Sequence, residues 1–221
     1  MLDVAIRGQG CGEAKRGPVS DPEGSGGGIL KLFLKLLASF VVALVLGVGS
    51  ALLLLRGGLG GTTAVGPWMT SDVIGSADAD PYTRARVAVG GLLALNRSET
   101  IYFTAATDSD GETLRMQCSY KIVGSDPPAR WWSITAYAAD HYLIPNPQDR
   151  YSYGGNTVAR EDDGSFVISA GPSESGGNWI PTGEGDGTFT LTLRLYNPAE
   201  EAVRDPSGIA LPRIAREACL R

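Results

Sequence analysis

TFTLTLRLY, residues 188–196, alternates polar and apolar side chains without interruption. Its apolar residues occupy every second position and are Phe189, Leu191, Leu193 and Leu195. A period of two places these side chains on one face of a β-strand, where a core can bury them. TLRMQCSYKI, residues 113–122, has the same alternation and puts Cys118 on its apolar face. Both segments therefore predict strands with one buried face and one outward face.

Turn signals separate further segments of this kind. Asp110-Gly111 lies between residues 100–107 and the alternating segment that begins at Thr113, which is typical of a hairpin. A second signal of this type, Asp-Asp-Gly at 162–164, separates residues 156–160 from a strand predicted over 165–170 and predicts another hairpin. About seven or eight short strands separated by turns predict a mainly β fold, a two-layer antiparallel β-sandwich.

One helix is predicted to flank the sandwich. Asp80-Pro81 is typical of a helix start, with the aspartate as N-cap and the proline in the first turn. Apolar residues keep helical spacing over 82–96, although the pair Gly90-Gly91 lies inside this range. Close packing of the helix onto a sheet would explain the glycine pair.

An apolar run of membrane-spanning length precedes all of these segments. Residues 36–55 carry no charge, and 20 residues of helix are about 30 Å long, the thickness of the hydrocarbon core of a bilayer. A cleaved signal peptide is an alternative, with Thr62-Thr63-Ala64 as a weak cleavage site. A buried core helix is a third, but it would normally show a polar face. We expect an uncleaved anchor.

The flanking charges predict how the chain crosses the membrane. Lys31 and Lys35 lie at the N-terminal end of the apolar run, and Arg56 alone lies at the other end. Positive residues tend to stay in the cytoplasm, so we expect a single-pass protein of the inner (cytoplasmic) membrane with its C-terminal domain in the periplasm. The expected parts are a disordered cytoplasmic tail (1–28), a transmembrane helix (29–56), a linker (57–80) and the β-sandwich (81–221).

Charge and cysteine content limit the partners of the outer part. Residues 57–221 contain 13 Arg and Lys against 20 Asp and Glu, a net charge of −7, which argues against nucleic acid. Cys118 and Cys219 both follow the apolar run, whereas Cys11 precedes it. An even number of cysteines in an oxidising compartment suggests a Cys118–Cys219 disulfide, with two free thiols as the alternative.

Small residues recur every four positions within the apolar run, at Ser39, Ala43, Gly47 and Ala51. This spacing lets two membrane helices approach closely and makes self-association a hypothesis. Small residues are also common in such helices without any partner, so the alternative stays open.

Several motifs follow one another in the outer domain. They are ARWWSITAY at 129–137, Asn146, RYS at 150–152, NWIP at 178–181 and LRLYNP at 193–198. In this order they resemble the domain of unknown function 1214 family over roughly residues 82–221. The resemblance implies a β-sandwich of jelly-roll type. Many relatives carry a second domain, of unknown function 1254, for which this chain has no room, so it looks like a short, membrane-anchored bacterial form. The family implies no reaction.

Aromatic and polar residues near these motifs are candidates for a ligand site. In the strand predicted over 130–137, alternation sends Trp131 and Trp132 to opposite faces, so one indole must leave the main core. Flat rings next to amide and guanidinium donors suit a small molecule or a glycan. The candidate ligand-binding residues are Trp131, Tyr137, Asn146, Arg150, Tyr151 and Trp179. The alternative is that these aromatics form a second small core.

Catalytic and metal-binding patterns are weak. His141 is the only histidine, and Asp140 beside it could orient it as a general base, but neighbouring residues point in different directions. A nucleophile would have to be Ser133 or Ser152, and no Gly-x-Ser-x-Gly elbow is present. No zinc-ligand spacing occurs, and we expect no metal and no cofactor.

The function that fits these observations best is a membrane-anchored envelope protein without enzymatic activity that binds a ligand or a partner. A periplasmic hydrolase is one alternative; it would use His141 or paired carboxylates such as Asp140 and Asp149. A structural subunit of an envelope complex, with the small-residue stripe as its membrane contact, is the other.

Overall fold

The structure is a computed structural model that describes residues 25–57, 62–71, 73–76, 79–89 and 94–220. The chain divides into two compact units, one ending at Gly49 and the other beginning at Ser50.

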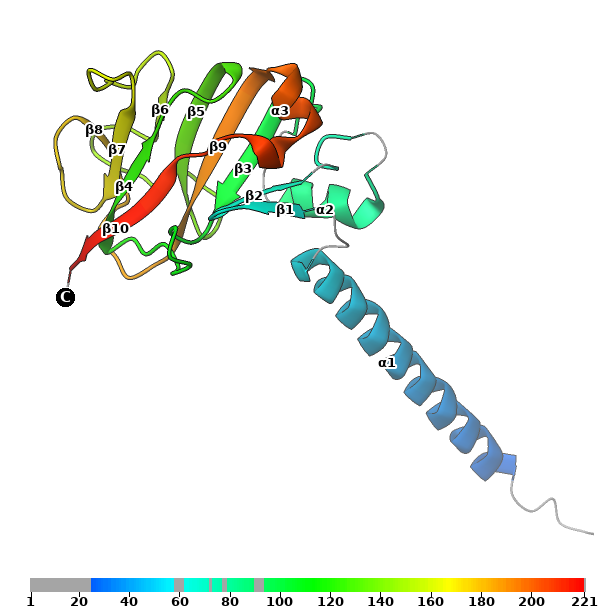
Figure 1. Ribbon diagram of the computed structural model, residues 1–221. Helices are drawn as coiled ribbons and strands as arrows, with labels where there is room; N and C mark the ends of the chain where they lie inside the picture. The colour runs from blue at the N-terminus through cyan, green and yellow to red at the C-terminus, as the bar shows by residue number, and fades with distance from the viewer. Residues whose placement is uncertain (1–24, 58–61, 72, 77–78, 90–93, 221) are drawn as a thin grey trace, which may run out of the picture. The chain divides into compact units, whose positions relative to one another are not determined.

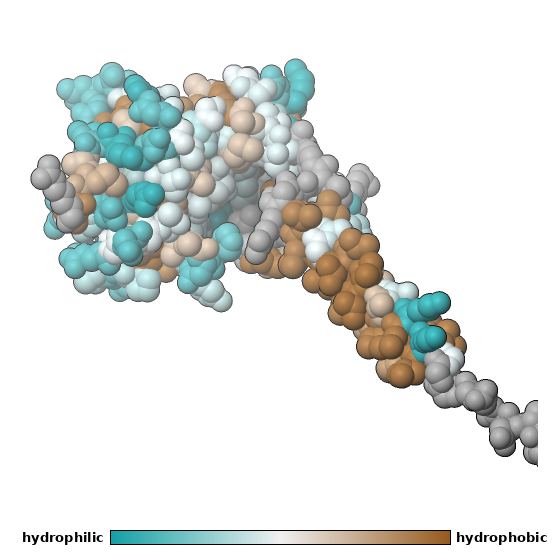
Figure 2. Space-filling view, turned by 90° about the horizontal axis from the view of Figure 1, so that it is seen from below, coloured by the Kyte–Doolittle hydropathy of each residue, from teal (hydrophilic) through white to brown (hydrophobic). Residues whose placement is uncertain are grey.

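The first unit contains most of a long apolar helix, α1, Ser25–Gly57. Residues Gly28–Leu54 of α1 are long and apolar enough to cross a membrane, as the sequence predicted. Figure 2 shows apolar residues covering this helix, with hydrophilic residues gathered toward its N-terminal end. The helix starts at Ser25, four residues before the predicted boundary, and residues 1–24 of the predicted tail lie outside the described residues. The stripe residues lie within α1, and their self-association stays a prediction.

The second unit is a two-layer β-sandwich, as predicted (Figure 1). The six-stranded sheet has the order β1-β2-β3-β9-β5-β6, and the four-stranded sheet has the order β10-β4-β7-β8. The strands of the larger sheet are β1 (Thr62–Val65), β2 (Trp68–Ser71), β3 (Thr100–Ala105), β9 (Phe189–Pro198), β5 (Ala129–Ala138) and β6 (Ser152–Gly154). Those of the smaller sheet are β10 (Arg213–Cys219), β4 (Cys118–Gly124), β7 (Phe166–Gly171) and β8 (Asn178–Pro181). Neighbouring strands are antiparallel except β7 and β8, which are parallel.

The alternating segment at 188–196 forms the central strand of the larger sheet. Strand β9 pairs with β3 on one side and β5 on the other, and Leu193 lies opposite both Phe103 and Ile134. These inward side chains are fully buried. Aromatic pairs connect the two sheets: Trp132 of β5 stacks on Phe166 of β7 with ring centroids 4.7 Å apart. The predicted buried face of this strand is therefore confirmed.

The segment predicted as a linker contains two strands instead. Strands β1 and β2 form a hairpin between residues 62 and 71, with Gly66 at a positive φ in the turn. Trp68 of β2 is completely buried, and its indole Nε1 donates a hydrogen bond to the carbonyl of Pro212 at 2.7 Å. The linker prediction is wrong here because four-residue strands are too short to show a clear alternation, whereas one buried tryptophan is enough to fix them to the core.

The turn at Asp110-Gly111 forms, but it does not join a regular hairpin. The Asp108 carboxylate accepts hydrogen bonds from the backbone N–H groups of Asp110 and Glu112, and Gly111 has a positive φ. Beyond one bridge between Thr107 and Thr113, the flanking chains separate, because β3 belongs to the larger sheet and β4 to the smaller. The turn therefore carries the chain between the two layers. The second predicted hairpin likewise has one bridge, Arg160 to Phe166.

Three shorter elements complete the unit. Helix α2 (Pro81–Val89) starts as predicted: the Asp80 carboxylate accepts hydrogen bonds from the backbone N–H groups of Tyr82 and Thr83. The hydrogen bond from the Thr83 hydroxyl is the main cause that lowers the pKa of Asp80. The pair Gly90-Gly91 lies outside the described residues. Helix α3 (Glu200–Arg204) and a 3-10 turn (Pro206–Gly208) follow β9.

A disulfide joins Cys118 of β4 to Cys219 of β10, in agreement with the sequence prediction. The two residues are register partners at the end of the antiparallel pair. Cys118 is buried and Cys219 is exposed, so the bridge connects the core to the last residues of the edge strand.

Candidate functional site: a cavity beside an outward tryptophan

Strand β5 places two consecutive tryptophans on opposite faces of the larger sheet. Trp132 points into the sandwich and is 2 % exposed, whereas Trp131 points outward and is 39 % exposed. The inward side chain belongs to the hydrophobic core. The outward side chain forms one end of the candidate site.

Three contacts fix the ring of Trp131. Its indole Nε1 donates a hydrogen bond to Oδ1 of Asn156 at 2.9 Å. Its ring lies against Tyr196 of β9, with centroids 4.9 Å apart and planes tilted by 42°. It also lies over Gly154 of β6, because a Cβ at that position would come within 2.8 Å of its Cζ2 atom. The ring is thus exposed and held in one orientation.

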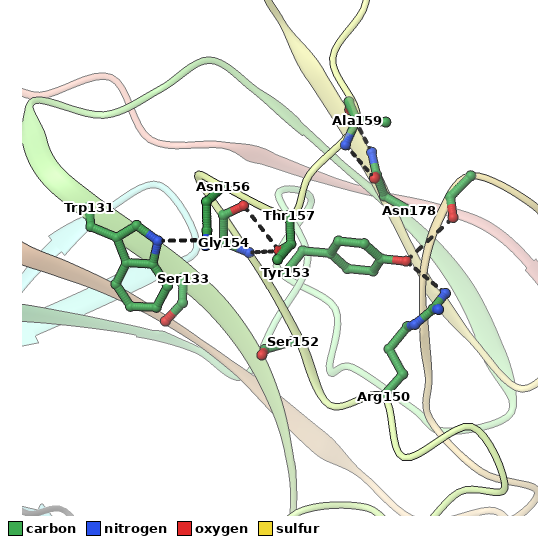
Figure 3. A pocket seen from close by; sticks show the side chains of 11 residues that line it. Trp131, Ser133, Arg150, Ser152, Tyr153, Gly154, Asn156, Thr157, Ala159 and Asn178 are labelled. Carbon is green, nitrogen blue, oxygen red and sulfur yellow. Dashed lines mark hydrogen bonds between the residues drawn. The ribbon is translucent and has the colours of Figure 1, made fainter.

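An open cavity of about 670 Å³ adjoins this ring (Figure 3). Its wall comes from β5, β6, the loops on both sides of β6, and the start of β8 with the residue before it. The lining residues are Trp131, Ser133, Arg150, Ser152, Tyr153, Gly154, Asn156, Thr157, Ala159, Gly177 and Asn178. This volume lies within the range of small-molecule sites.

Part of the cavity wall is a rigid frame whose hydrogen bonds are already used. The Tyr153 hydroxyl accepts from Arg150 Nη1 at 2.9 Å and from the backbone N–H of Trp179 at 3.1 Å, and it contacts the carbonyl of Gly177 at 3.4 Å. Asn178 accepts from the N–H of Ala159 and donates to two backbone carbonyls. These two side chains hold the loops together and have little capacity left for a ligand.

Other polar groups in the wall have capacity left. Among the described residues, neither the Ser133 nor the Ser152 hydroxyl has a hydrogen-bond partner, and Figure 3 shows both between Trp131 and Tyr153. The Asn156 amide uses its oxygen for Trp131, which leaves its NH₂ group. The cavity therefore combines an aromatic face with unused hydroxyl and amide groups.

Among the residues that the structure describes, Arg150 is the only charged one in the wall of this cavity. Its Nη1 donates to the Tyr153 hydroxyl, and its guanidinium carbon lies 5.6 Å from the centre of the same ring. Arg150 forms no ion pair with any described carboxylate. The remaining donors of its guanidinium are thus available on a side chain that is already oriented.

A smaller depression of about 240 Å³ shares Trp131 and Asn156 with the cavity. Its floor contains an ion pair in which Arg160 Nη2 lies 2.8 Å from an Asp126 carboxylate oxygen. The same Asp126 carboxylate accepts a hydrogen bond from Nε1 of Trp132 at 2.8 Å. The depression lies beside the indole of Trp131, and its acidic group is paired.

Comparison with known proteins places these residues in a family. Residues 99–200 match the model of a family described as protein of unknown function, DUF1214. The chain carries a DUF1214 domain. The whole cavity wall lies within the matched residues.

Solved structures resemble this DUF1214 protein over part of their length. The VPA0106 protein from Vibrio parahaemolyticus is 25 % identical with a TM-score of 0.52, and the match covers 64 % of this chain and 36 % of that one. An uncharacterised protein from Burkholderia cenocepacia is 15 % identical with a TM-score of 0.37, covering 55 % of this chain and 30 % of the other. This chain thus spans about a third of the length of each. A search of curated proteins gives no significant match.

The DUF1214 cavity contains two of the six predicted ligand residues, Trp131 and Arg150. Tyr137 lies further along the outward face of β5, where its hydroxyl accepts a hydrogen bond from Arg194 at 2.9 Å. The other three have structural contacts elsewhere. Asn146 closes its own loop through Arg150, whose N–H donates to its Oδ1.

Tyr151 and Trp179 also lie outside the cavity wall. The Tyr151 hydroxyl donates to the Asp149 carboxylate at 3.2 Å, and this hydrogen bond raises the pKa of Tyr151. Trp179 belongs to β8, is 5 % exposed, and donates from Nε1 to the Gly171 carbonyl. A buried indole with a satisfied N–H is typical of packing.

The predicted acid–base pair is not assembled at the cavity. Asp140 and His141 are exposed in a turn after β5, where His141 has a positive φ and Asp140 accepts from the backbone N–H of Tyr142. Neither residue lines the cavity, and neither does Asp149. The serines considered as nucleophiles, Ser133 and Ser152, do line it, without a described histidine or carboxylate in the wall.

Asn156 and the glycines at 154 and 155 are site residues that were not predicted from the sequence. A signal was present, because Gly154-Gly155-Asn156 directly follows Tyr151-Ser152-Tyr153 and glycine permits close approach of other groups. A Cβ at Gly155 would come within 3.2 Å of Trp132 Nε1, as one at Gly154 would meet Trp131. The glycine pair therefore makes room for both indoles.

Proposed function

We propose that this DUF1214 protein is a membrane-anchored binding protein of the bacterial cell envelope, without enzymatic activity, which binds a small hydroxylated ligand beside Trp131. The observation that carries the proposal is an exposed indole, fixed by Asn156 and Tyr196, at the end of a cavity with unused polar groups.

A sugar ring is the ligand class that suits this wall. The apolar face of a sugar stacks on an aromatic ring, and its hydroxyls exchange hydrogen bonds with side-chain hydroxyl and amide groups. The wall offers Trp131 for the first contact, and Ser133, Ser152 and the Asn156 amide for the second. Because the ring of Trp131 is already oriented, binding loses little conformational entropy there.

The proposed location rests on α1 and on the disulfide. Lys31 and Lys35 lie at the N-terminal end of the apolar segment, which favours a cytoplasmic N-terminus and a periplasmic DUF1214 domain. A disulfide between Cys118 and Cys219 is stable in the periplasm, which is oxidising. The inner membrane of a bacterium is the place that supplies both conditions.

Tryptophan fluorescence gives a direct test of ligand binding. The other tryptophans, Trp68, Trp132 and Trp179, are at most 5 % exposed, so Trp131 is the indole that a neutral quencher such as acrylamide can reach in the folded chain. The full chain in detergent micelles would be titrated with hexoses, N-acetylhexosamines and uronic acids. We expect at least one of these sugars to protect the accessible fluorescence from quenching.

Two variants control this test. Trp131→Phe should remove the quenchable component and weaken sugar binding measured by calorimetry. Tyr142→Ala is the matched control, because Tyr142 is also an exposed aromatic residue but does not line the cavity. If no sugar protects Trp131, or if both variants weaken binding equally, the proposed function is wrong.

The orientation has its own test in intact cells. With Cys118 and Cys219 bridged, Cys11 is the remaining thiol of the chain. A membrane-impermeant maleimide applied outside the inner membrane should fail to label Cys11 until that membrane is permeabilised. Labelling of Cys11 without permeabilisation would show that the N-terminus lies outside the inner membrane and that the proposed orientation is wrong.

A further inference from the structure

We infer that the ligand is an acidic sugar whose carboxylate pairs with Arg150, an inference that rests on the proposed sugar binding beside Trp131. The described residues of the cavity wall carry a single formal charge, and this charge is positive. The surrounding domain is acidic, with a net charge of −7 over residues 57–221. The charge of the cavity wall is therefore opposite in sign to the net charge of the domain that contains it.

The guanidinium of Arg150 is prepared for an anion. Tyr153 fixes it by a hydrogen bond from Nη1 at 2.9 Å and by the ring, 5.6 Å from the guanidinium carbon. A neutral hydroxyl and a ring orient the guanidinium without neutralising its charge. Arg150 forms no ion pair among the described residues, so its other donors can form a bidentate pair with a carboxylate.

The neighbouring charged groups do not compete for this role. The carboxylate closest in sequence, Asp149, accepts a hydrogen bond from the Tyr151 hydroxyl. Asp126, in the adjoining depression, pairs with Arg160 and accepts from Trp132. We therefore expect the carboxylate that forms an ion pair with the Arg150 guanidinium to come from the ligand.

Different side chains of the cavity wall would contact the ring, the hydroxyl groups and the carboxylate of such a ligand. Trp131 and Arg150 come from β5 and from the loop before β6, and Figure 3 shows them on opposite sides of the Ser133 and Ser152 hydroxyls. The indole would stack on the sugar ring, the serines would bond its hydroxyls, and the guanidinium would bind its carboxylate. A uronic acid contains all three features in one residue.

The test compares glucuronate with glucose as probes on the full chain in detergent micelles, read by protection of Trp131 from acrylamide. We expect glucuronate to bind at least about tenfold more tightly than glucose, which is the usual contribution of a charge-assisted bidentate pair. Arg150→Gln should remove this preference, so that the variant binds glucuronate and glucose with affinities within about twofold of each other. Arg150→Lys should retain part of the preference for glucuronate, because lysine keeps the positive charge but cannot form two parallel hydrogen bonds to a carboxylate.

Arg213→Gln is the matched control. It removes one positive charge from β10, on the smaller sheet, and should leave the preference for glucuronate unchanged. The inference is overturned if glucuronate and glucose bind equally, or if Arg150→Gln weakens both equally, since the arginine would then act only through the Tyr153 frame. In both cases protection of Trp131 by sugars would still support the proposed function. Absence of any protection would overturn both.

Discussion

Trp131 and Trp132 are adjacent residues of the same type, but one side chain is exposed and the other is buried. Trp132 stacks on Phe166 inside the sandwich and donates its N–H to Asp126, whereas Trp131 lies outside and donates its N–H to Asn156. The pleat of one strand separates them, because successive side chains point to opposite faces. One indole therefore contributes mainly to stability, and the other is available for binding. Four substitution experiments can break or sharpen this division.

The largest expected effect is on the inner indole. Trp132→Ala should lower the free energy of unfolding by about 3–5 kcal/mol, because it leaves a cavity in a close-packed core. Trp131→Ala should lower it by less than about 1.5 kcal/mol, since the side chain is already partly in solvent. Denaturant unfolding of the full chain in micelles, followed by near-UV circular dichroism, measures both. An equal decrease in the free energy of unfolding for both variants would show that the two tryptophans contribute equally to stability.

The glycine pair gives the next largest effect. Gly154→Ala should cost about 1–3 kcal/mol, because the new Cβ would lie 2.8 Å from the Trp132 carbonyl oxygen and 2.8 Å from the Trp131 ring. The backbone oxygen cannot move away, so the strand must shift and Trp131 must leave its position. Gly155→Ala should cost less, since its closest contact is a side-chain atom at 3.2 Å. The reverse order would contradict the contacts described above.

Removing the partner of each indole N–H gives a smaller pair of effects. Asp126→Ala should lower the free energy of unfolding by about 1–2 kcal/mol, because it leaves the N–H of buried Trp132 without a partner. Asn156→Ala should change stability by only a few tenths of a kcal/mol, since water can replace the amide at the exposed ring. It should instead lower the fluorescence anisotropy of Trp131 and weaken sugar binding. Unchanged anisotropy would mean that Asn156 does not hold the ring.

The smallest effect concerns pH. Hydrogen bonds from Thr83, Ser165 and Ser207 lower the pKa values of Asp80, Asp163 and Asp205. A carboxyl with a lowered pKa stabilises the fold above its unfolded pKa of about 3.9, and this contribution is lost as the pH falls through the folded value. The free energy of unfolding of Trp131→Ala and of Trp132→Ala should therefore fall by equal amounts as the pH drops below about 3.9, so that the difference between the two variants stays constant. A change near neutral pH would require another titrating group.

Local patterns in the sequence predicted the features that local geometry determines. The alternation at 188–196 predicted the buried face of β9, and the same rule separated Trp131 from Trp132. Asp80-Pro81 predicted the start of α2. Each of these depends on a period or a cap within a few residues, which the chain shows directly.

Features that depend on distant segments could not be predicted in this way. The assignment of β3 and β4 to different sheets follows from pairing with β9 and β7, far along the chain. The cavity wall joins β5, β6 and β8, so Asn156 and Ser133 meet only after folding. Trp179 and Tyr151 are aromatic residues next to the family motifs, but the hydrogen bonds and burial that separate packing from binding appear only in the folded chain.

The Cys118–Cys219 bridge also affects how the domain would withstand proteases. The bond joins two residues that are 101 positions apart in the sequence, and every residue of the cavity wall lies inside that covalent ring. A peptidase that cuts one exposed loop within the ring, such as the turn containing His141, would leave the two fragments tied together by sulfur. A single cleavage within the ring would therefore release neither strand β10 nor the cavity wall from the rest of the chain. Two cleavages would be needed to remove a fragment of the domain.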